Sequence, residues 1–132
     1  MNINTKVAVI DNGTGYTKMG YAGNTEPAFD IPTLITDSGD QSGKTGWAMS
    51  NKKITETLDF VIGEDARELT RTQKVVNPIE GGIVKNWDLM EKFWHRSLFD
   101  YLRCDPQETV VVLTEPPLNP PENREHIAEI MF

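Results

Sequence analysis

The chain has a single cysteine, Cys104, among its 132 residues. Secreted domains of this size normally pair several cysteines, so the count excludes a disulfide-stabilised scaffold and favours a reducing compartment. No apolar run approaches the roughly 20 residues that a membrane-spanning helix needs, and the stretch before Lys6 is too short and polar for a signal peptide. We therefore expect a cytoplasmic protein without a membrane partner.

Basic residues are also scarce. The chain has 13 Lys and Arg residues against 20 Asp and Glu residues, which gives a formal net charge of -7. A nucleic-acid-binding surface needs clustered basic side chains that neutralise backbone phosphates. We therefore expect no nucleic-acid partner.

The polar stretch between Thr36 and Lys53 has too few apolar residues to build a core, and we interpret it as a mobile insertion. Its sequence Ser-Gly-Lys-Thr at 42–45 resembles the end of a P-loop. That motif needs a glycine five positions before Gly43, where this chain has Ser38. We therefore expect a flexible loop here instead of a phosphate site.

The first 35 residues predict a three-stranded meander. Lys6–Asp11 is a compact apolar run of the kind that is buried on both faces of a sheet, and it ends in a glycine turn. Tyr16–Tyr21 alternates and predicts the hairpin partner of that strand, and Ala28–Ile31 predicts a third strand.

The second half predicts helix, strand and helix. Asp88 and Glu91 have the spacing of a capping box before a helix whose apolar residues recur up to Leu102. Thr109–Leu113 is β-branched and predicts a buried strand. Asn119, followed by Pro120, predicts the start of a final helix that has no stop signal before Phe132. The order indicates an α/β fold, and we expect the element that packs against the final helix to be missing.

The sequence Asp-Asn-Gly-Thr-Gly-Tyr-Thr-Lys at 11–18 combines residue types that suit phosphate binding. Gly13 and Gly15 allow positive φ and let backbone N–H groups approach phosphate oxygens. The Thr14 hydroxyl can add a donor, and Lys18 adds a point charge on the same strand face as Tyr16. The alternative is an ordinary glycine hairpin with a solvated lysine, and the octet alone does not decide between the two.

An acid at the end of the preceding strand completes the candidate site. Mg²⁺ keeps most of its waters and is usually bound through one or two carboxylates together with phosphate oxygens. Asp11 is therefore the candidate metal residue, acting through water. No other residue is a candidate ligand, and we assign no catalytic residue in this chain.

The chain resembles actin and the actin-related proteins over nearly its whole length. Five separated blocks occur in the family's order, and they are Asp11–Lys18, Gly20–Asn24, Pro78–Asp88, Leu113–Asn119 and Asn123–Phe132. The resemblance implies an actin-like ATPase fold of ribonuclease-H-like halves, of which this chain holds an incomplete first half with a small polar insertion. It divides the chain into 1–35 with the phosphate hairpin, 36–72 as the insertion, and 73–132 as the return to the first subdomain.

The resemblance also implies ligands and partners. Gly13, Thr14, Gly15, Tyr16 and Lys18 would bind the phosphates of ATP, and Asp11 would lie near Mg²⁺. The family's second phosphate hairpin, adenosine pocket and water-positioning groups belong to segments after Phe132, so we expect half of a nucleotide site and no catalysis by this chain alone.

Within the family, the blocks are most similar to a subunit of the complex that nucleates branched actin filaments. Its partners would be actin and the other subunits, and its location the cytoplasmic cytoskeleton. The polar sequence Ser38–Asn51 stands in the place of actin's subunit-gripping loop and has few of the apolar residues that an interface core prefers, so we expect no self-polymer. The alternatives are a phosphotransferase of the same superfamily, such as a sugar kinase, and an inactive truncated product.

Overall fold

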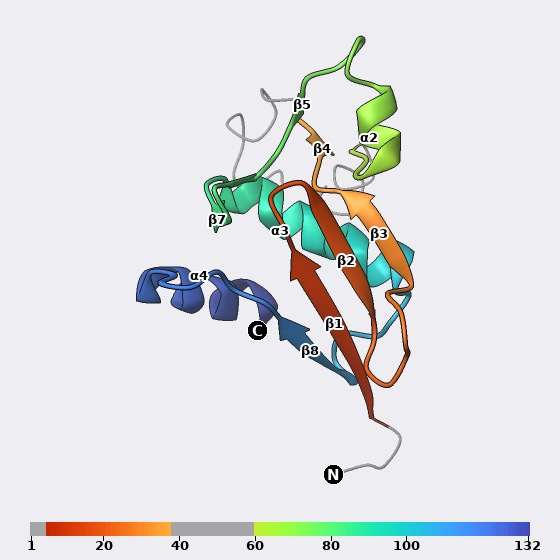
Figure 1. The fold of residues 1–132 in the computed structure, drawn as a ribbon, viewed down its shortest axis with the longest axis vertical. Helices are drawn as coiled ribbons and strands as arrows, with labels where there is room; N and C mark the ends of the chain where they lie inside the picture. Colours follow the sequence, from red (N-terminus) through yellow and green to blue (C-terminus); the bar gives the residue numbers. More distant parts are fainter. Residues whose placement is uncertain (1–4, 38–59) are drawn as a thin grey trace, which may run out of the picture.

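The computed structural model describes residues 5–37 and 60–132. Its main sheet has the order β3-β2-β1-β8 (Figure 1). These strands are β1 (Lys6–Asn12), β2 (Tyr16–Tyr21), β3 (Phe29–Pro32) and β8 (Thr109–Leu113). The first three pair antiparallel, which confirms the predicted meander, and β8 pairs parallel with β1. The α/β fold class is confirmed.

Short elements connect the meander to the second half of the chain. They comprise the helix α2 (Glu64–Glu68), which lies next to β3, and two small sheets. One pairs β4 (Ile35–Thr36) with β5 (Val75–Val76), and the other pairs β6 (Ile79–Glu80) with β7 (Ile83–Val84). Most of the predicted insertion, including 38–53 and the P-loop-like sequence at 42–45, lies outside the described residues.

The long predicted helix is present, but its cap is not the predicted one. The helix α3 spans Trp87–Arg96 and continues into the π-helical turn η1 (Ser97–Tyr101). The Asn86 side chain accepts a hydrogen bond from the Leu89 N–H at 3.1 Å and caps the helix. The predicted capping box at Asp88 and Glu91 was therefore wrong, because asparagine is as effective a cap as aspartate and occurs two residues earlier.

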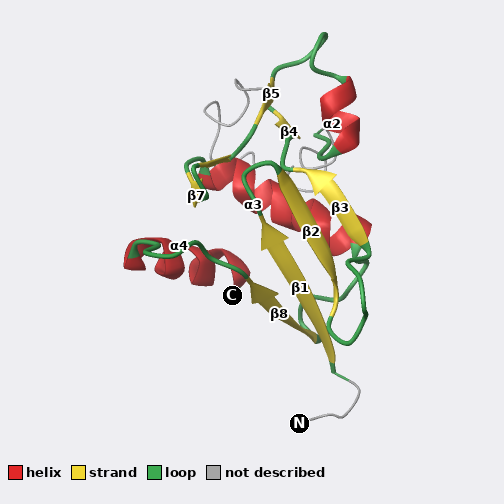
Figure 2. Cartoon of the chain, viewed as in Figure 1, coloured by secondary structure: helices red, strands yellow, loops and turns green. Residues whose placement is uncertain are grey.

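The core lies between the sheet and α3, which covers one sheet face (Figure 2). Ile10 and Met19 point into it from β1 and β2, and Met90 and Phe93 point into it from α3. None of these four side chains is more than 1% exposed. The helix periodicity of the sequence thus identifies the face that buries apolar area.

The prediction that β8 is buried was wrong. Val110 and Val112 are 51% and 44% exposed, whereas Val111 and Leu113 pack partly against the core. β8 is the last strand of the described sheet, and alternate side chains point away from α3. Val7 and Val9 share that outer face by register and are only half-buried, so β1 is not buried on both faces either.

The final helix α4 spans Pro121–Met131 and follows β8 (Figure 1). Pro120 occupies the cap position and no side chain caps the helix, so Asn119 is not the helix start that the sequence predicted. Ile127, Ile130 and Met131 are partly buried against the core. Among the described residues, no helix is both long and apolar enough to cross a bilayer.

Candidate functional site

The predicted phosphate hairpin is the connection between β1 and β2. The Gly13 N–H donates to the Tyr16 carbonyl at 3.0 Å, which leaves Thr14 and Gly15 as the tip of the turn. The antiparallel pairing of β1 with β2 begins next to the turn, with Asn12 opposite Thr17. The hairpin is therefore a tight reversal with Thr14 and Gly15 at its tip.

The two glycines of the hairpin are not required for positive φ, which was the reason that the sequence suggested. Neither Gly13 nor Gly15 has φ in the left-handed region. A Cβ on Gly13 would lie 2.7 Å from the Tyr16 carbonyl oxygen, whereas a Cβ on Gly15 would meet no atom within 4 Å. Gly13 is thus required by the close approach of two backbone segments, and Gly15 is not sterically required.

The predicted charged residues face the same side of the sheet. Asp11 pairs with Lys18 across β1 and β2, and Lys18 pairs with Asp30 across β2 and β3. Tyr16 and Lys18 are exposed and Thr17 is buried, as the predicted alternation requires. Lys18 makes no ion pair with a described residue, so its ammonium group is available to an anionic ligand.

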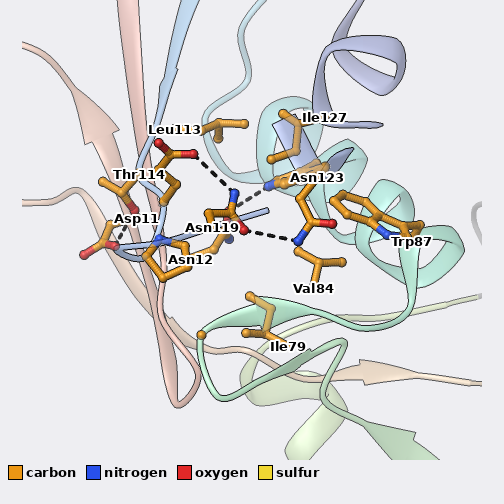
Figure 3. A pocket seen from close by; sticks show the side chains of 14 residues that line it. Asp11, Asn12, Ile79, Val84, Trp87, Leu113, Thr114, Asn119, Asn123 and Ile127 are labelled. Atoms are coloured by element: carbon orange, nitrogen blue, oxygen red, sulfur yellow. Dashed lines mark hydrogen bonds between the residues drawn. The ribbon is translucent and has the colours of Figure 1, made fainter. Parts of the chain in front are cut away.

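Asp11 is held in place by the residue that follows β8. The Thr114 hydroxyl donates to Asp11 Oδ1 at 2.6 Å, and this bond is drawn in Figure 3. The other carboxylate oxygen accepts no hydrogen bond from a described residue. The carboxylate is thus anchored on one side and open on the other.

The hairpin tip is joined to the segment around β6 and β7. The Gly82 N–H donates to the Thr14 hydroxyl at 2.8 Å, and the Asn77 side chain donates to the Thr14 carbonyl. Asn77 and Gly82 were not predicted as site residues. Gly82 and its neighbour Gly81 both have positive φ and form the turn between β6 and β7.

A second unpredicted contact comes from α2. Arg67 Nη2 donates to the Tyr16 hydroxyl at 3.1 Å, and its guanidinium lies 5.6 Å from the centre of the Tyr16 ring. This hydrogen bond raises the pKa of Arg67 above its ordinary value. No sequence spacing indicates the contact, because the two residues are 51 positions apart.

A cavity of about 200 Å³ lies beside the hairpin (Figure 3). Its volume is below the roughly 300–1,000 Å³ of typical ligand pockets, so the cavity is too small for a nucleotide.

A hydrogen-bond network lines this cavity. The Asn119 side chain donates to Glu115 at 3.2 Å, and the Asn123 side chain donates to Asn119 at 3.1 Å. Hydrogen bonds from Arg124, which has the larger effect, and from Asn119 lower the pKa of Glu115 below its ordinary value. This network ties the start of α4 to the loop after β8.

A comparison with protein families decides the relationship. The actin family model matches residues 3–132. The chain belongs to the actin family. It is 53% identical over 124 residues to actin-related protein 3 of Dictyostelium discoideum, covering 94% of this chain and 29% of that protein. Identity is 51% to actin-related protein 3 of Caenorhabditis elegans and 50% to that of Acanthamoeba castellanii, each covering 94% of this chain and 30% of the relative. The chain thus spans about 30% of the length of these relatives.

The donor set of this actin-family hairpin fits a phosphate group. The N–H groups of Thr14 and Gly15 form no hydrogen bond with a described acceptor, and Lys18 adds a cation on the next strand. Paired backbone donors and an ammonium group are the usual partners of phosphate oxygens. The open oxygen of Asp11 suits a hydrated Mg²⁺ ion, which needs few protein ligands. The described residues contain no cluster of three or more metal-ligating side chains.

Proposed function

We propose that the hairpin between β1 and β2 binds the phosphates of ATP. The observation that carries the proposal is the pair of turn amides, at Thr14 and Gly15, that lack an acceptor in the described chain. Such amides are costly to leave without a partner when a site closes over them, and a phosphate oxygen satisfies them. Gly13 supports the donors by allowing the tight turn.

Each remaining side chain of the site has a role in this proposal. Lys18 neutralises phosphate charge, and the Thr14 hydroxyl, whose oxygen already accepts from Gly82, keeps its proton for a phosphate oxygen. Tyr16 contributes a backbone donor and is held by Arg67. Asp11 would hold Mg²⁺ through water, and the metal would neutralise phosphate charge when bound.

We infer that the chain forms part of an actin-related subunit of the actin-related protein 2/3 complex, which nucleates branched actin filaments. The identities of about 50% to proteins named actin-related protein 3 support this role. The partners would then be actin and the other subunits of the complex, in the cytoplasmic cytoskeleton. In this role ATP would act as a conformational ligand.

The 132-residue polypeptide should bind Mg-ATP weakly or not at all. The described donors approach a phosphate group from one side only, whereas strong charge stabilisation in such sites needs donors that converge from both sides. Isothermal titration calorimetry of the purified polypeptide with Mg-ATP tests this expectation. Micromolar binding would overturn it, and Lys18→Ala is the control that identifies whether any heat comes from this hairpin.

The full-length protein should not form filaments by itself. The sequence at 38–51, which lies outside the described residues, has few of the apolar side chains that interface cores contain. Negative-stain electron microscopy of the full-length protein, under conditions in which actin polymerises, checks this prediction. Regular filaments of the protein alone would contradict it, and added actin provides the positive control.

A further inference from the structure

A row of polar side chains lies beneath the hairpin, between α3 and the turn. Trp94 Nε1 donates to Asn12 Oδ1 at 2.7 Å, and Asn12 Nδ2 donates to Thr17 Oγ1 at 3.2 Å. The Thr17 and Thr33 hydroxyl oxygens are 2.9 Å apart, and the Thr33 hydroxyl donates to the Gly13 carbonyl at 2.8 Å. Four hydrogen bonds therefore connect α3 to the backbone of the hairpin.

The chemistry of the two ends fixes the direction of every bond in this row. An indole N–H only donates, so Asn12 must present its oxygen to Trp94 and its NH₂ group to Thr17. The Gly13 carbonyl only accepts, so the single Thr33 proton is committed to it. Thr17 must then donate to Thr33, and all donors point from Trp94 toward Gly13.

The row ends on the peptide group that carries a proposed phosphate donor. The Gly13 carbonyl and the Thr14 N–H belong to one peptide unit, and a hydrogen bond to the carbonyl polarises that N–H. The same relation recurs twice. Asn77 donates to the Thr14 carbonyl, in the peptide of the Gly15 N–H. The Thr33 N–H donates at 3.0 Å to the Gly15 carbonyl, in the peptide of the Tyr16 N–H.

Asn77 is also held in one orientation. Its Oδ1 accepts from the Ile79 N–H at 2.8 Å, so the NH₂ end must face Thr14. Each of the three carbonyls that precede the proposed phosphate donors thus accepts a hydrogen bond from Thr33 or Asn77. Each peptide is oriented with its N–H directed away from the supporting framework.

We propose that Thr33 is a positioning residue for phosphate binding, supported by the row from Trp94 and by Asn77, and that it orients and polarises the amides of the hairpin turn. The proposal rests on the proposed phosphate function of the hairpin. Thr17 and Thr33 are both 0% exposed. Valine has nearly the shape of threonine and would avoid burying a hydroxyl, so the two buried hydroxyls are best explained by the bonds that they make.

The test compares Thr33→Val with Thr33→Ser in the ¹⁵N-labelled chain without ligand. Loss of the hydroxyl leaves the Gly13 carbonyl without its side-chain donor and loosens the turn. We expect the Gly13 amide, which bonds Tyr16 in the parent chain, to exchange with solvent roughly tenfold faster in Thr33→Val. The Thr14 nitrogen resonance should shift as well. Thr33→Ser, which keeps the hydroxyl, should restore both values to within about twofold of the parent.

A second pair of variants keeps the test decisive if Thr33→Val does not fold. Trp94→Phe removes the first donor of the row and keeps most of the ring, whereas Trp87→Phe changes an indole outside the row. Only Trp94→Phe should speed exchange at Gly13 while the amide of Phe93 in the core stays protected. Unchanged Gly13 exchange and Thr14 resonance in both Thr33→Val and Trp94→Phe would overturn the proposal.

A separate titration distinguishes this proposal from the phosphate function on which it rests. Millimolar pyrophosphate with Mg²⁺ is added to the parent chain and the shifts of residues 13–16 are followed. A phosphate site with donors on one side requires at least weak binding, which millimolar pyrophosphate is enough to reveal, so absence of a response would count against the hairpin as a phosphate site. The ligand-free comparison of the variants does not depend on this outcome. If the parent responds, Thr33→Val should need roughly tenfold more pyrophosphate for the same shift, and an equal requirement would count against positioning.

Discussion

Replacing Phe93 with alanine should destabilise the chain by about 3–5 kcal/mol. Phe93 lies on α3 with its side chain 0% exposed, at the centre of the core between the helix and the sheet. The substitution removes most of an aromatic ring from a site where the surrounding side chains can only partly collapse. Since folded domains are stable by only about 5–15 kcal/mol, this variant should be largely unfolded at moderate urea.

Phe99→Ala is the matched control for Phe93→Ala. Phe99 follows on the same helical segment and is 47% exposed, and its ring centre lies 4.5 Å from that of His95. Its loss should cost less than about 1 kcal/mol. Urea unfolding followed by far-ultraviolet circular dichroism compares the two variants. Equal destabilisation would show that the core does not lie where this structure puts it.

The elements that the sequence predicted correctly are those defined by neighbouring residues. The glycine turn at 13–15 separates two runs that pair with each other, so the hairpin needs no information from elsewhere in the chain. The apolar residues of 87–102 recur at helical spacing, and the face that they define is the buried one. Local patterns of this kind identify an element together with its partner face.

The features that the sequence could not predict depend on which elements become neighbours. Val110 and Val112 have the composition of a buried strand, and only their place on the outer face of an edge strand exposes them. The parallel pairing of β8 with β1 joins segments about a hundred residues apart. The two-residue strands β4 to β7 are too short to show any alternation.

The candidate site divides in the same way. Gly13, Thr14 and Lys18 were indicated by residue type and spacing within one octet. Their supporting partners were not, because a threonine at 33 or an asparagine at 77 has no pattern that points to a turn far away in the sequence. Even the reason for Gly13 changed, from positive φ to close contact with the Tyr16 carbonyl. Residue types thus indicated the chemistry, and the fold determined how it is held.

Replacing Gly13 with alanine should abolish any phosphate response of the hairpin and cost about 1–3 kcal/mol of stability. The new Cβ would lie 2.7 Å from the Tyr16 carbonyl oxygen, which is the acceptor of the Gly13 N–H bond that closes the turn. The backbone on both sides must move apart, because neither contacting atom is in a flexible side chain. The amides of Thr14 and Gly15 then lose their common orientation.

Gly15→Ala separates this steric argument from a general need for glycine. A Cβ at Gly15 meets nothing within 4 Å and φ lies outside the left-handed region, so stability should stay within about 1 kcal/mol of the parent. Urea unfolding and the pyrophosphate titration are measured on both variants and the parent. If Gly15→Ala were as damaging as Gly13→Ala, backbone freedom throughout the turn would be the requirement instead of space at residue 13. If neither were damaging, the hairpin would be looser than its 3.0 Å closing bond implies.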